Sequence, residues 1–425
     1  MTQSSKKGGK RTLALHWQIL IGIGSGAVAG IFLSRIIPFE TWSPYVKWIG
    51  DIFLRALRMI VIPLVFTSIA VGVAGMGDSK ALGRIAGKTF GFYALTTAIA
   101  ATVGLVLVNL IKPGKGLEMA VDSSAAAEFT TAQVPLAERL VNIVPANIFE
   151  SLANGDLLPI IFFAVIFGFF MGKVESKHTE TLRNFLTAVY EVTMKITFFV
   201  IRLAPVGVFA IVAGVVGKQA GDPEALIDLA GGLGTFVLVI WAGLLFHGGI
   251  ILPSLVRVLG RQNPWKHMSK MSSTLLTAFS TSSSGAALPI NIRDTQEKCG
   301  VSPKIAGFVL PLGCTVNMNG TALYECVTAL FIAQAYGIDL TLAQQILLVV
   351  TALVVAVGTA GIPMAGLVML TIVLTAVGLP LEGIGLIMAV EYLCDMPRSV
   401  INVYGDSCAA IVVAASEGEK LTIND

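Results

Sequence analysis

The chain has 425 residues, of which 55% are hydrophobic and only 13% are charged. This composition excludes an ordinary soluble domain and is typical of a polytopic membrane protein. The formal net charge of +3 is too small to favour nucleic acid as a partner. The five cysteines show no metal-site spacing, and their odd number argues against a disulfide framework.

Basic residues crowd the N-terminus just before the first apolar segment, at Lys6, Lys7, Lys10 and Arg11. Such a cluster predicts a cytoplasmic start. The following apolar run has spanning length and no small-residue cleavage pattern, so no cleavable signal is expected. We predict a multi-pass protein of the cell membrane with both termini in the cytoplasm.

Six apolar segments of roughly spanning length come first in the chain, at residues 17–37, 52–75, 87–111, 157–171, 192–216 and 233–252. The fourth is short and is expected to be one piece of a broken helix. Counting the spans from a cytoplasmic N-terminus places the polar stretch 112–147 outside the cell. The next connection, 172–183, then lies in the cytoplasm, as its basic charge favours.

The second half of the chain repeats one pattern twice. Apolar stretches broken by small polar residues and proline, at 280–289 and 358–366, have arms of about 10–18 residues, which suits re-entrant helical hairpins. Each is followed by a longer apolar segment, 305–333 (broken at 317–321) and 383–415. We predict an all-α protein with eight transmembrane helices and two hairpins, a duplication typical of secondary transporters. The alternative is that both breaks are ordinary loops.

A narrow polar stripe runs along the last apolar segment. At about 100° per residue, Glu391, Asp395, Arg398, Asn402 and Asp406 fall within roughly 80° of arc. Ionisable groups in a membrane span are costly and face a bundle interior, a cavity or a ligand. A solvated surface helix and a purely structural Asp395–Arg398 ion pair are the alternatives.

The chemistry of this stripe favours a ligand with both signs of charge. Arg398 suits a carboxylate and Asp395 an ammonium, while helix ends at the hairpin tips suit a second carboxylate. These groups together fit an acidic amino acid. Asn317, Asn402 and Asp406, with carbonyls freed by the break at 317–321, suit a hard monovalent cation.

Four motifs in order resemble those of the glutamate transporter family of sodium-coupled dicarboxylate and amino-acid symporters. They are SSSG at 282–285 with LP at 288–289, NMNGTALYE at 317–325, GTAGIP at 358–363, and DMPRS at 395–399 followed by Asn402 and the GD at 405–406. The resemblance extends from RMIVIPLV at 58–65 to residue 415.

The resemblance implies a homotrimer in membrane lipid, with inverted repeats and an elevator mechanism gated by the second hairpin. The scaffold would comprise residues 1–75 and 112–220, and the moving transport domain 76–111 and 221–416, followed by a cytoplasmic tail at 417–425. Implied substrate contacts are Ser283, Ser284, Thr321, Gly361, Ala365, Asp395, Arg398, Ser399 and Asn402.

The resemblance also implies three sodium sites. The first would use Gly313, Asn317, Asn402 and Asp406, the second Thr315 and Thr359, and the third Tyr93, Thr96, Thr97, Asn317 and Asn319. The family usually has Asp where Asn319 stands, so the third site loses a formal charge. Glu325 stands where animal acidic transporters keep a protonatable Glu, and is a candidate proton carrier.

We therefore expect sodium-coupled import of L-aspartate or L-glutamate, with a proton as a further coupling ion. Alternatives are a proton-coupled carrier, a neutral amino-acid or C4-dicarboxylate carrier, and a substrate-gated anion channel. An enzyme is not expected, because no nucleophile–base pair or metal motif stands out and the four histidines are scattered.

Overall fold

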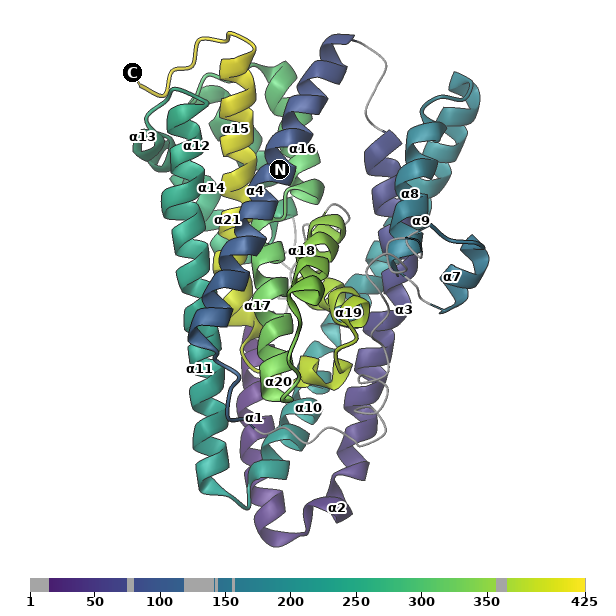
Figure 1. Cartoon of the computed structure of the whole chain (residues 1–425), viewed down its shortest axis with the longest axis vertical. Coiled ribbons are helices and arrows are strands. Elements are labelled where there is room, and N and C mark those ends of the chain that lie inside the picture. The colour runs from purple at the N-terminus through teal and green to yellow at the C-terminus, as the bar shows by residue number, and fades with distance from the viewer. Residues whose placement is uncertain are drawn as a thin grey trace, which may run out of the picture.

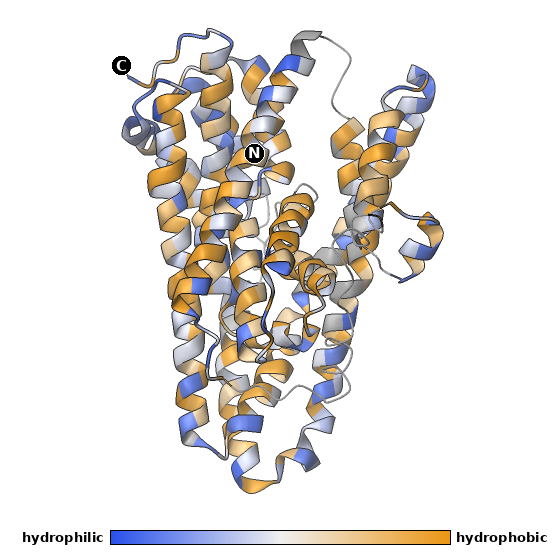
Figure 2. Ribbon diagram, in the orientation of Figure 1, coloured by the Kyte–Doolittle hydropathy of each residue, from blue (hydrophilic) through white to orange (hydrophobic). Residues whose placement is uncertain are grey.

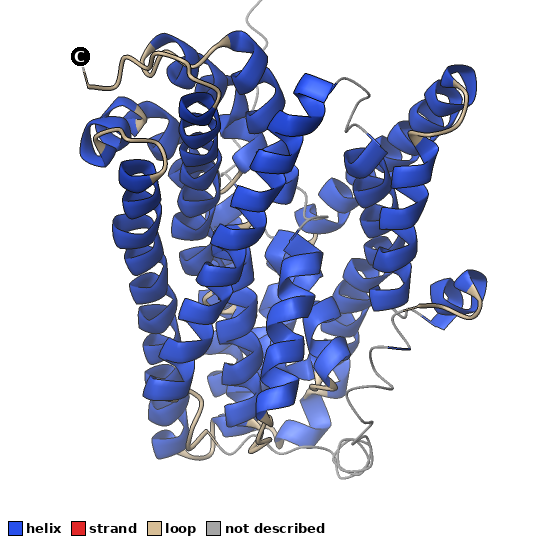
Figure 3. Ribbon diagram, turned by 45° about the horizontal axis from the view of Figure 1, so that its top comes forward, coloured by secondary structure: helices blue, strands red, loops and turns tan. Residues whose placement is uncertain are grey.

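The computed structural model describes residues 15–74, 80–117, 141, 144–154, 157–356 and 365–424. Within these ranges the regular structure is helical and contains no strand (Figure 3). The prediction of an all-α chain is confirmed for this part of the protein.

One group of helices comes from the first half of the chain. Its members are α1 (Leu15–Ile36), α2 (Phe39–Trp42), α3 (Pro44–Ala74), α7 (Ile148–Asn154), α8 (Leu157–Met171), α9 (Ser176–Arg202) and α10 (Ala204–Gln219). α3 packs against α8, α9 and α10, and α10 lies along α1 (Figure 1).

Small residues allow the close approach of α1 and α10. A Cβ atom added at Gly22, Gly26 or Gly30 would lie 2.5 or 2.6 Å from a backbone oxygen of α10. These three glycines follow one another at intervals of four residues, so they form a single face of α1. Close packing of small residues is a common means of helix association in membranes.

The second group contains α4 and the second half of the chain. Its members are α4 (Lys80–Ile111), α11 (Pro223–Phe246), the π-helix η1 (His247–Ile251), α12 (Leu252–Val258), α13 (Pro264–Lys270), α14 (Ser272–Thr281), α15 (Ser284–Glu297), α16 (Pro303–Val316), α17 (Asn319–Ala335), α18 (Leu342–Ala356), α19 (Ala365–Val377), the 3₁₀ turn η2 (Leu381–Gly383), α20 (Ile384–Met388) and α21 (Glu391–Ser416). α17 packs against α4, α11 and α21. α17 and α21 are buried along most of their length and form the centre of this group.

The predicted break near residue 317 is present. α16 ends at Val316, and Asn317 (φ −94°, ψ 81°) and Met318 (φ −110°, ψ 54°) leave the helical conformation before α17 begins. A separate short helix, α7, precedes the short fourth segment, and residues 155–156 between them lie outside the described residues. Most of the basic connection 172–183 is helical, because α9 already begins at Ser176 and only residues 172–175 lie between α8 and α9.

The first predicted hairpin is formed by α14 and α15, which pack against each other. Its tip contains Ser282 in the left-handed conformation (φ 48°, ψ 36°), which reverses the chain between the two arms. α18 and α19 flank the stretch predicted to form the second hairpin tip, and they also pack together. The tip between them, residues 357–364, lies outside the described residues.

Three described helical stretches are long and apolar enough to cross a membrane, namely Gly83–Ile111, Glu224–Val258 and Glu391–Ser416. They correspond to the third, sixth and eighth predicted spans. Figure 2 shows hydrophobic residues along α8 and α11, and hydrophilic residues near both ends of the molecule. Together with the apolar composition, these helices indicate a membrane protein.

Candidate functional site

The guanidinium of Arg398 is the centre of the polar stripe on α21. Its Nη2 donates a hydrogen bond to Oε1 of Glu391 at 2.9 Å and a second one to Oδ1 of Asp395. All three side chains are buried, with Arg398 only 2% exposed. The Asp395–Arg398 ion pair considered from the sequence therefore exists, and Glu391 extends it. Two carboxylates around one guanidinium leave this cluster with an excess of acidic groups.

Tyr324 of α17 supports the same guanidinium from another side. The Arg398 guanidinium carbon lies 4.3 Å from the centre of the Tyr324 ring, which is a cation–π contact. The Tyr324 hydroxyl donates to Oε2 of Glu391, so the aromatic ring and the carboxylate hold each other in place. No local pattern in the sequence shows which residue of α17 faces α21, so the role of Tyr324 could not be predicted.

One nitrogen of Arg398 remains available. Nη1 is buried and has no hydrogen-bond partner among the described residues. It lies toward the first turn of α19, where a Cβ atom on Gly366 would be 2.5 Å from it. A buried donor without a partner is costly, and the chemistry of this nitrogen suits an anionic acceptor such as a carboxylate.

The tip of the first hairpin lies beside α21. Ala278 and Ala287, from the two arms, pack with Val403 of α21. Ser283 is the N-cap of α15, and its hydroxyl accepts a hydrogen bond from the backbone N–H of Ala286 at 3.2 Å. Ser283 and Ser284 are both buried. The free N–H groups of the first turn of α15 suit an anionic group.

Asn402 connects α21 to the break between α16 and α17. Its Oδ1 accepts from the backbone N–H of Gly320 at 2.8 Å, and its Nδ2 donates to the Thr321 hydroxyl at 3.2 Å. Asn402 thus satisfies an N–H group at the start of α17. The same contacts place Thr321 next to α21, and both side chains are buried.

Asn317 and Asp406 form a buried pair on the other side of the break. Nδ2 of Asn317 donates to Oδ1 of Asp406 at 2.8 Å and to the carbonyl of Asn402 at 3.3 Å. Oδ1 of Asn317 has no hydrogen-bond partner among the described residues. A Cβ atom on Gly313 would overlap the Asp406 carboxylate, so glycine keeps this position open. The oxygen-rich pair fits a hard cation.

Asn319 bonds to two other residues of the predicted third cation site. Its Oδ1 accepts hydrogen bonds from the hydroxyls of Thr97 at 2.7 Å and Thr96 at 3.3 Å. Tyr93, from the same helix α4, donates its hydroxyl to the carbonyl of Val309 at 2.9 Å. The structure therefore brings α4, α16 and α17 together at these residues.

The remaining predicted site residues are distributed as follows. Ser399 is buried on α21, and Thr315 donates its hydroxyl to the carbonyl of Leu312 at 3.1 Å. Glu325 is fully buried on α17, and neither of its carboxyl oxygens has a hydrogen-bond partner among the described residues. Ala365 is the first residue of α19, while Thr359 and Gly361 lie outside the described residues.

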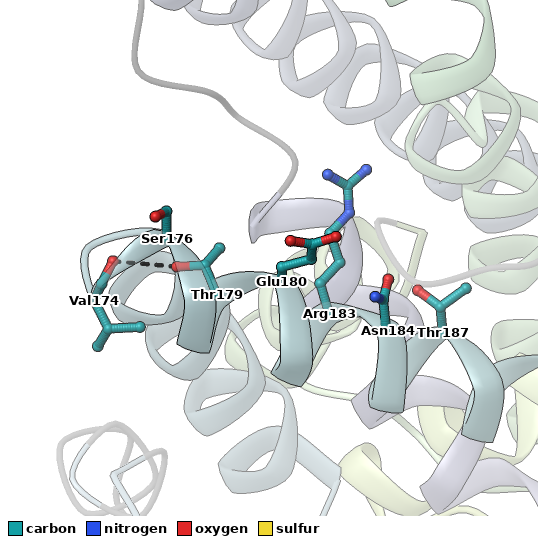
Figure 4. A pocket seen from close by; sticks show the side chains of 8 residues that line it. Val174, Ser176, Thr179, Glu180, Arg183, Asn184 and Thr187 are labelled. Atoms are coloured by element: carbon teal, nitrogen blue, oxygen red, sulfur yellow. Dashed lines mark hydrogen bonds between the residues drawn. The ribbon is translucent and has the colours of Figure 1, made fainter.

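Of two hollows in the structure, one is lined by predicted site residues and the other is not. A cavity of about 290 Å³ is lined by residues of both helix groups and includes Tyr93 and Thr97 of the predicted third cation site. A larger polar pocket of about 630 Å³ lies at the start of α9, where Glu180, Arg183 and Asn184 project from one side of the helix (Figure 4). None of the predicted site residues lines this second pocket.

Comparison with known proteins identifies the family of this chain. The sequence profile of the sodium:dicarboxylate symporter family matches residues 15–416. The chain is 39% identical to a proton/sodium-glutamate symport protein of Bacillus caldotenax, with 96% of each chain covered. It is 36% identical to a proton/glutamate-aspartate symporter of Escherichia coli (95% and 93% covered), and 33% to a C4-dicarboxylate transport protein of Agrobacterium fabrum (95% and 88% covered).

The matched family and these relatives are symporters, so this helical membrane protein is a transporter by class and not an enzyme. The chain belongs to the sodium:dicarboxylate symporter family, since the family match covers nearly its whole length. The family resemblance read from the sequence motifs is confirmed.

Proposed function

We propose that the protein is a secondary active symporter that imports L-aspartate or L-glutamate coupled to sodium. The observation that carries this proposal is the buried Arg398 guanidinium, whose Nη1 has no partner among the described residues. The names of the glutamate and glutamate-aspartate symporters among the relatives support the substrate class.

The substrate is proposed to bind between α21 and the two hairpins. Its side-chain carboxylate binds Arg398, and its ammonium group binds Asp395, one helical turn away. Its α-carboxylate binds at the first hairpin, near Ser283 and Ser284. Asn402, Thr321 and Ser399 complete the site together with Gly361 and Ala365 of the second hairpin.

Sodium is proposed to bind as a transported cation at the oxygen-rich positions. The first site uses Asp406, Asn317 and Asn402 with the carbonyl of Gly313, and the orphan Oδ1 of Asn317 supports it. The second uses Thr315 and Thr359. The third uses Tyr93, Thr96, Thr97, Asn317 and Asn319, where the amide of Asn319 offers no formal charge.

A proton is proposed as a further coupling ion, carried by Glu325. This side chain is fully buried, and its oxygens have no partner among the described residues. An isolated ionised carboxylate in such a place is very costly, and a proton removes that cost. Substitution Glu325→Gln should then uncouple transport from an imposed proton gradient while leaving sodium dependence intact.

The proposed architecture has eight transmembrane helices and two re-entrant hairpins, assembled as a homotrimer in the cell membrane with cytoplasmic termini. Residues 1–75 and 112–220 form the scaffold, and 76–111 with 221–416 form the transport domain, which moves as an elevator. The packing of α3 with α8, α9 and α10, and of α4 with α17, supports this division.

Calorimetric titration of the purified protein tests the substrate and the ion together. Aspartate or glutamate should bind in sodium and bind much more weakly without it, and serine should bind poorly because it has no second carboxylate for Arg398. Succinate distinguishes an amino-acid carrier from a C4-dicarboxylate carrier like that named for the Agrobacterium relative. Succinate has no ammonium group for Asp395, so an amino-acid carrier should bind it poorly. Tight succinate binding with no aspartate binding would overturn the proposal.

A further inference from the structure

The residues that follow α21 cross the end of the molecule where that helix ends (Figure 1). Glu417 accepts hydrogen bonds from Nε of Arg84 at 3.0 Å and from Nζ of Lys88 at 2.6 Å, both at the start of α4. This pair of basic partners lowers the pKa of Glu417 to about 2, the Arg84 hydrogen bond being the larger cause. The segment therefore begins with a charged contact that persists at neutral pH.

The same segment next binds the far end of the first hairpin, between α15 and α16. Oε2 of Glu419 accepts from the backbone N–H of Ser302 at 3.0 Å. The backbone N–H of Thr422 donates to the carbonyl of Cys299 at 3.0 Å. Gly300 (φ +78°) allows its own segment and the residues around Thr422 to approach closely, because a Cβ atom at Gly300 would lie 2.9 Å from the Thr422 backbone nitrogen.

It then binds α13, which leads into the near arm of the hairpin. Nζ of Lys270 donates to the carbonyl of Thr422 at 2.5 Å, and Lys266 donates to the carbonyl of Asn424. Oδ1 of Asn424 accepts from the backbone N–H of Asn263 at 3.0 Å. Both ends of the hairpin are thus bonded to one short segment.

Two side chains anchor this segment to the folded core. Ile423 is fully buried, and Leu421 packs against the main hydrophobic cluster. The two hairpin arms are also joined to each other at their base. Asp294 of α15 is buried and accepts from Ser273 and, at 3.0 Å, from Thr274 of α14. These bonds hold the two arms together at their base.

We propose that Glu417–Asn424 is a strap that fixes the base of the first hairpin and so positions Ser283 and Ser284 in the substrate site. Glu419 and Asn424 are its main positioning side chains, because each satisfies a backbone N–H group at one end of the hairpin. The strap itself is inferred from contacts alone, and only its effect on substrate affinity rests on the proposed function.

Cys299 provides a native reporter of the strap. Its side chain is fully buried beside the strap, and burial raises the pKa of its thiol to about 11. Both properties make the thiol slow to react with a maleimide while the strap is in place. The reaction rate at Cys299, followed by peptide mass spectrometry, therefore measures how often the strap opens.

The test compares two matched pairs of variants. Glu419→Ala and Asn424→Ala remove the acceptor for Ser302 or Asn263, whereas Glu419→Gln and Asn424→Asp keep an acceptor oxygen at the same place. The alanine variants should label Cys299 about tenfold faster than the unmodified protein. The conservative variants, and Lys420→Ala at an exposed position of the same segment, should label at the unmodified rate.

The alanine variants should also bind substrate several-fold more weakly, with the sodium slope unchanged. Unchanged labelling in both alanine variants would overturn the strap, as would equally fast labelling in the conservative variants. Faster labelling with unchanged affinity would overturn its positioning role. Absence of amino-acid binding in the unmodified protein would contradict the proposed transport function instead, while the labelling result would still decide whether the strap exists.

Discussion

The hydroxyl of Thr97 donates a hydrogen bond to Oδ1 of Asn319 at 2.7 Å, joining α4 to the start of α17 inside the buried core. The Thr96 hydroxyl lies 3.3 Å from the same oxygen, so the Asn319 amide turns its Oδ1 toward both threonines. That nitrogen has no hydrogen-bond partner among the described residues. Asn319 thus occupies the predicted third cation site as a neutral acceptor.

Restoring a carboxylate at this position should increase cation binding. In Asn319→Asp the buried negative charge needs a counter-ion, so sodium should stabilise the variant more than it stabilises the unmodified protein. The slope of log Kd for aspartate against log sodium concentration should become steeper by about one. Asn109→Asp, at a partly buried position on α4 that bonds Gln345, is the control and should leave the slope unchanged. An unchanged slope in Asn319→Asp would place this residue outside the cation shell.

Arg398 is the residue on which acidic-substrate binding should depend most strongly. Arg398→Lys is the most informative change, because it keeps a positive charge beside Glu391 and Asp395 but loses the planar fork. Aspartate affinity should fall about 10- to 100-fold, since one nitrogen cannot serve both the internal carboxylates and the substrate. Calorimetric titration in saturating sodium checks this. Unchanged aspartate affinity would refute the role assigned to the guanidinium.

The sequence predicted features that depend on local pattern. The polar stripe on α21 could be predicted because Arg398 and Asp406 fall on one face of an otherwise apolar helix. The helix break at Asn317 could be predicted because polar residues interrupt an apolar run there. The hairpin arms followed from the serine- and glycine-containing interruptions.

Contacts between distant segments could not be read in the same way. Tyr324 looks like any other aromatic residue of a buried helix until α21 is placed beside it. Pro397 leaves the carbonyl of Leu393 without its helical partner, and Trp241 of α11 donates its indole N–H to that carbonyl at 3.0 Å. Nothing near Trp241 in the chain indicates this. Glu417 and Asn424 also acquire their partners only in the folded protein.

The glycine face of α1 makes a prediction about stability. Gly26→Ala should destabilise the protein by about 1–3 kcal/mol, because its Cβ atom would lie 2.6 Å from the backbone oxygen of Phe209. Gly24→Ala is the matched control on the same helix, since a Cβ atom there has no neighbour within 4 Å among the described residues. Thermal unfolding in one detergent compares the two. Equal Tm values would contradict the close α1–α10 contact.

The Glu417 contact predicts a pH dependence of stability. Its pKa is lowered from 4.5 to about 2 by Arg84 and Lys88, so its stabilising effect is complete above about pH 5. The effect should be lost as the pH falls from about 4.5 toward 2, where the folded protein also takes up the proton. The Tm difference between the unmodified protein and Glu417→Gln should be constant from pH 8 to 5 and shrink below that. A difference that disappears by pH 7 would contradict this assignment.

Uptake into proteoliposomes tests the central proposal most directly. Labelled L-aspartate or L-glutamate is supplied outside vesicles with an inward sodium gradient, an inward proton gradient, both, or neither. We predict accumulation above the external concentration when the sodium gradient is present, and its collapse when the ion gradients are dissipated. Uptake that only equilibrates, at the same rate and extent with and without the gradients, would contradict the account.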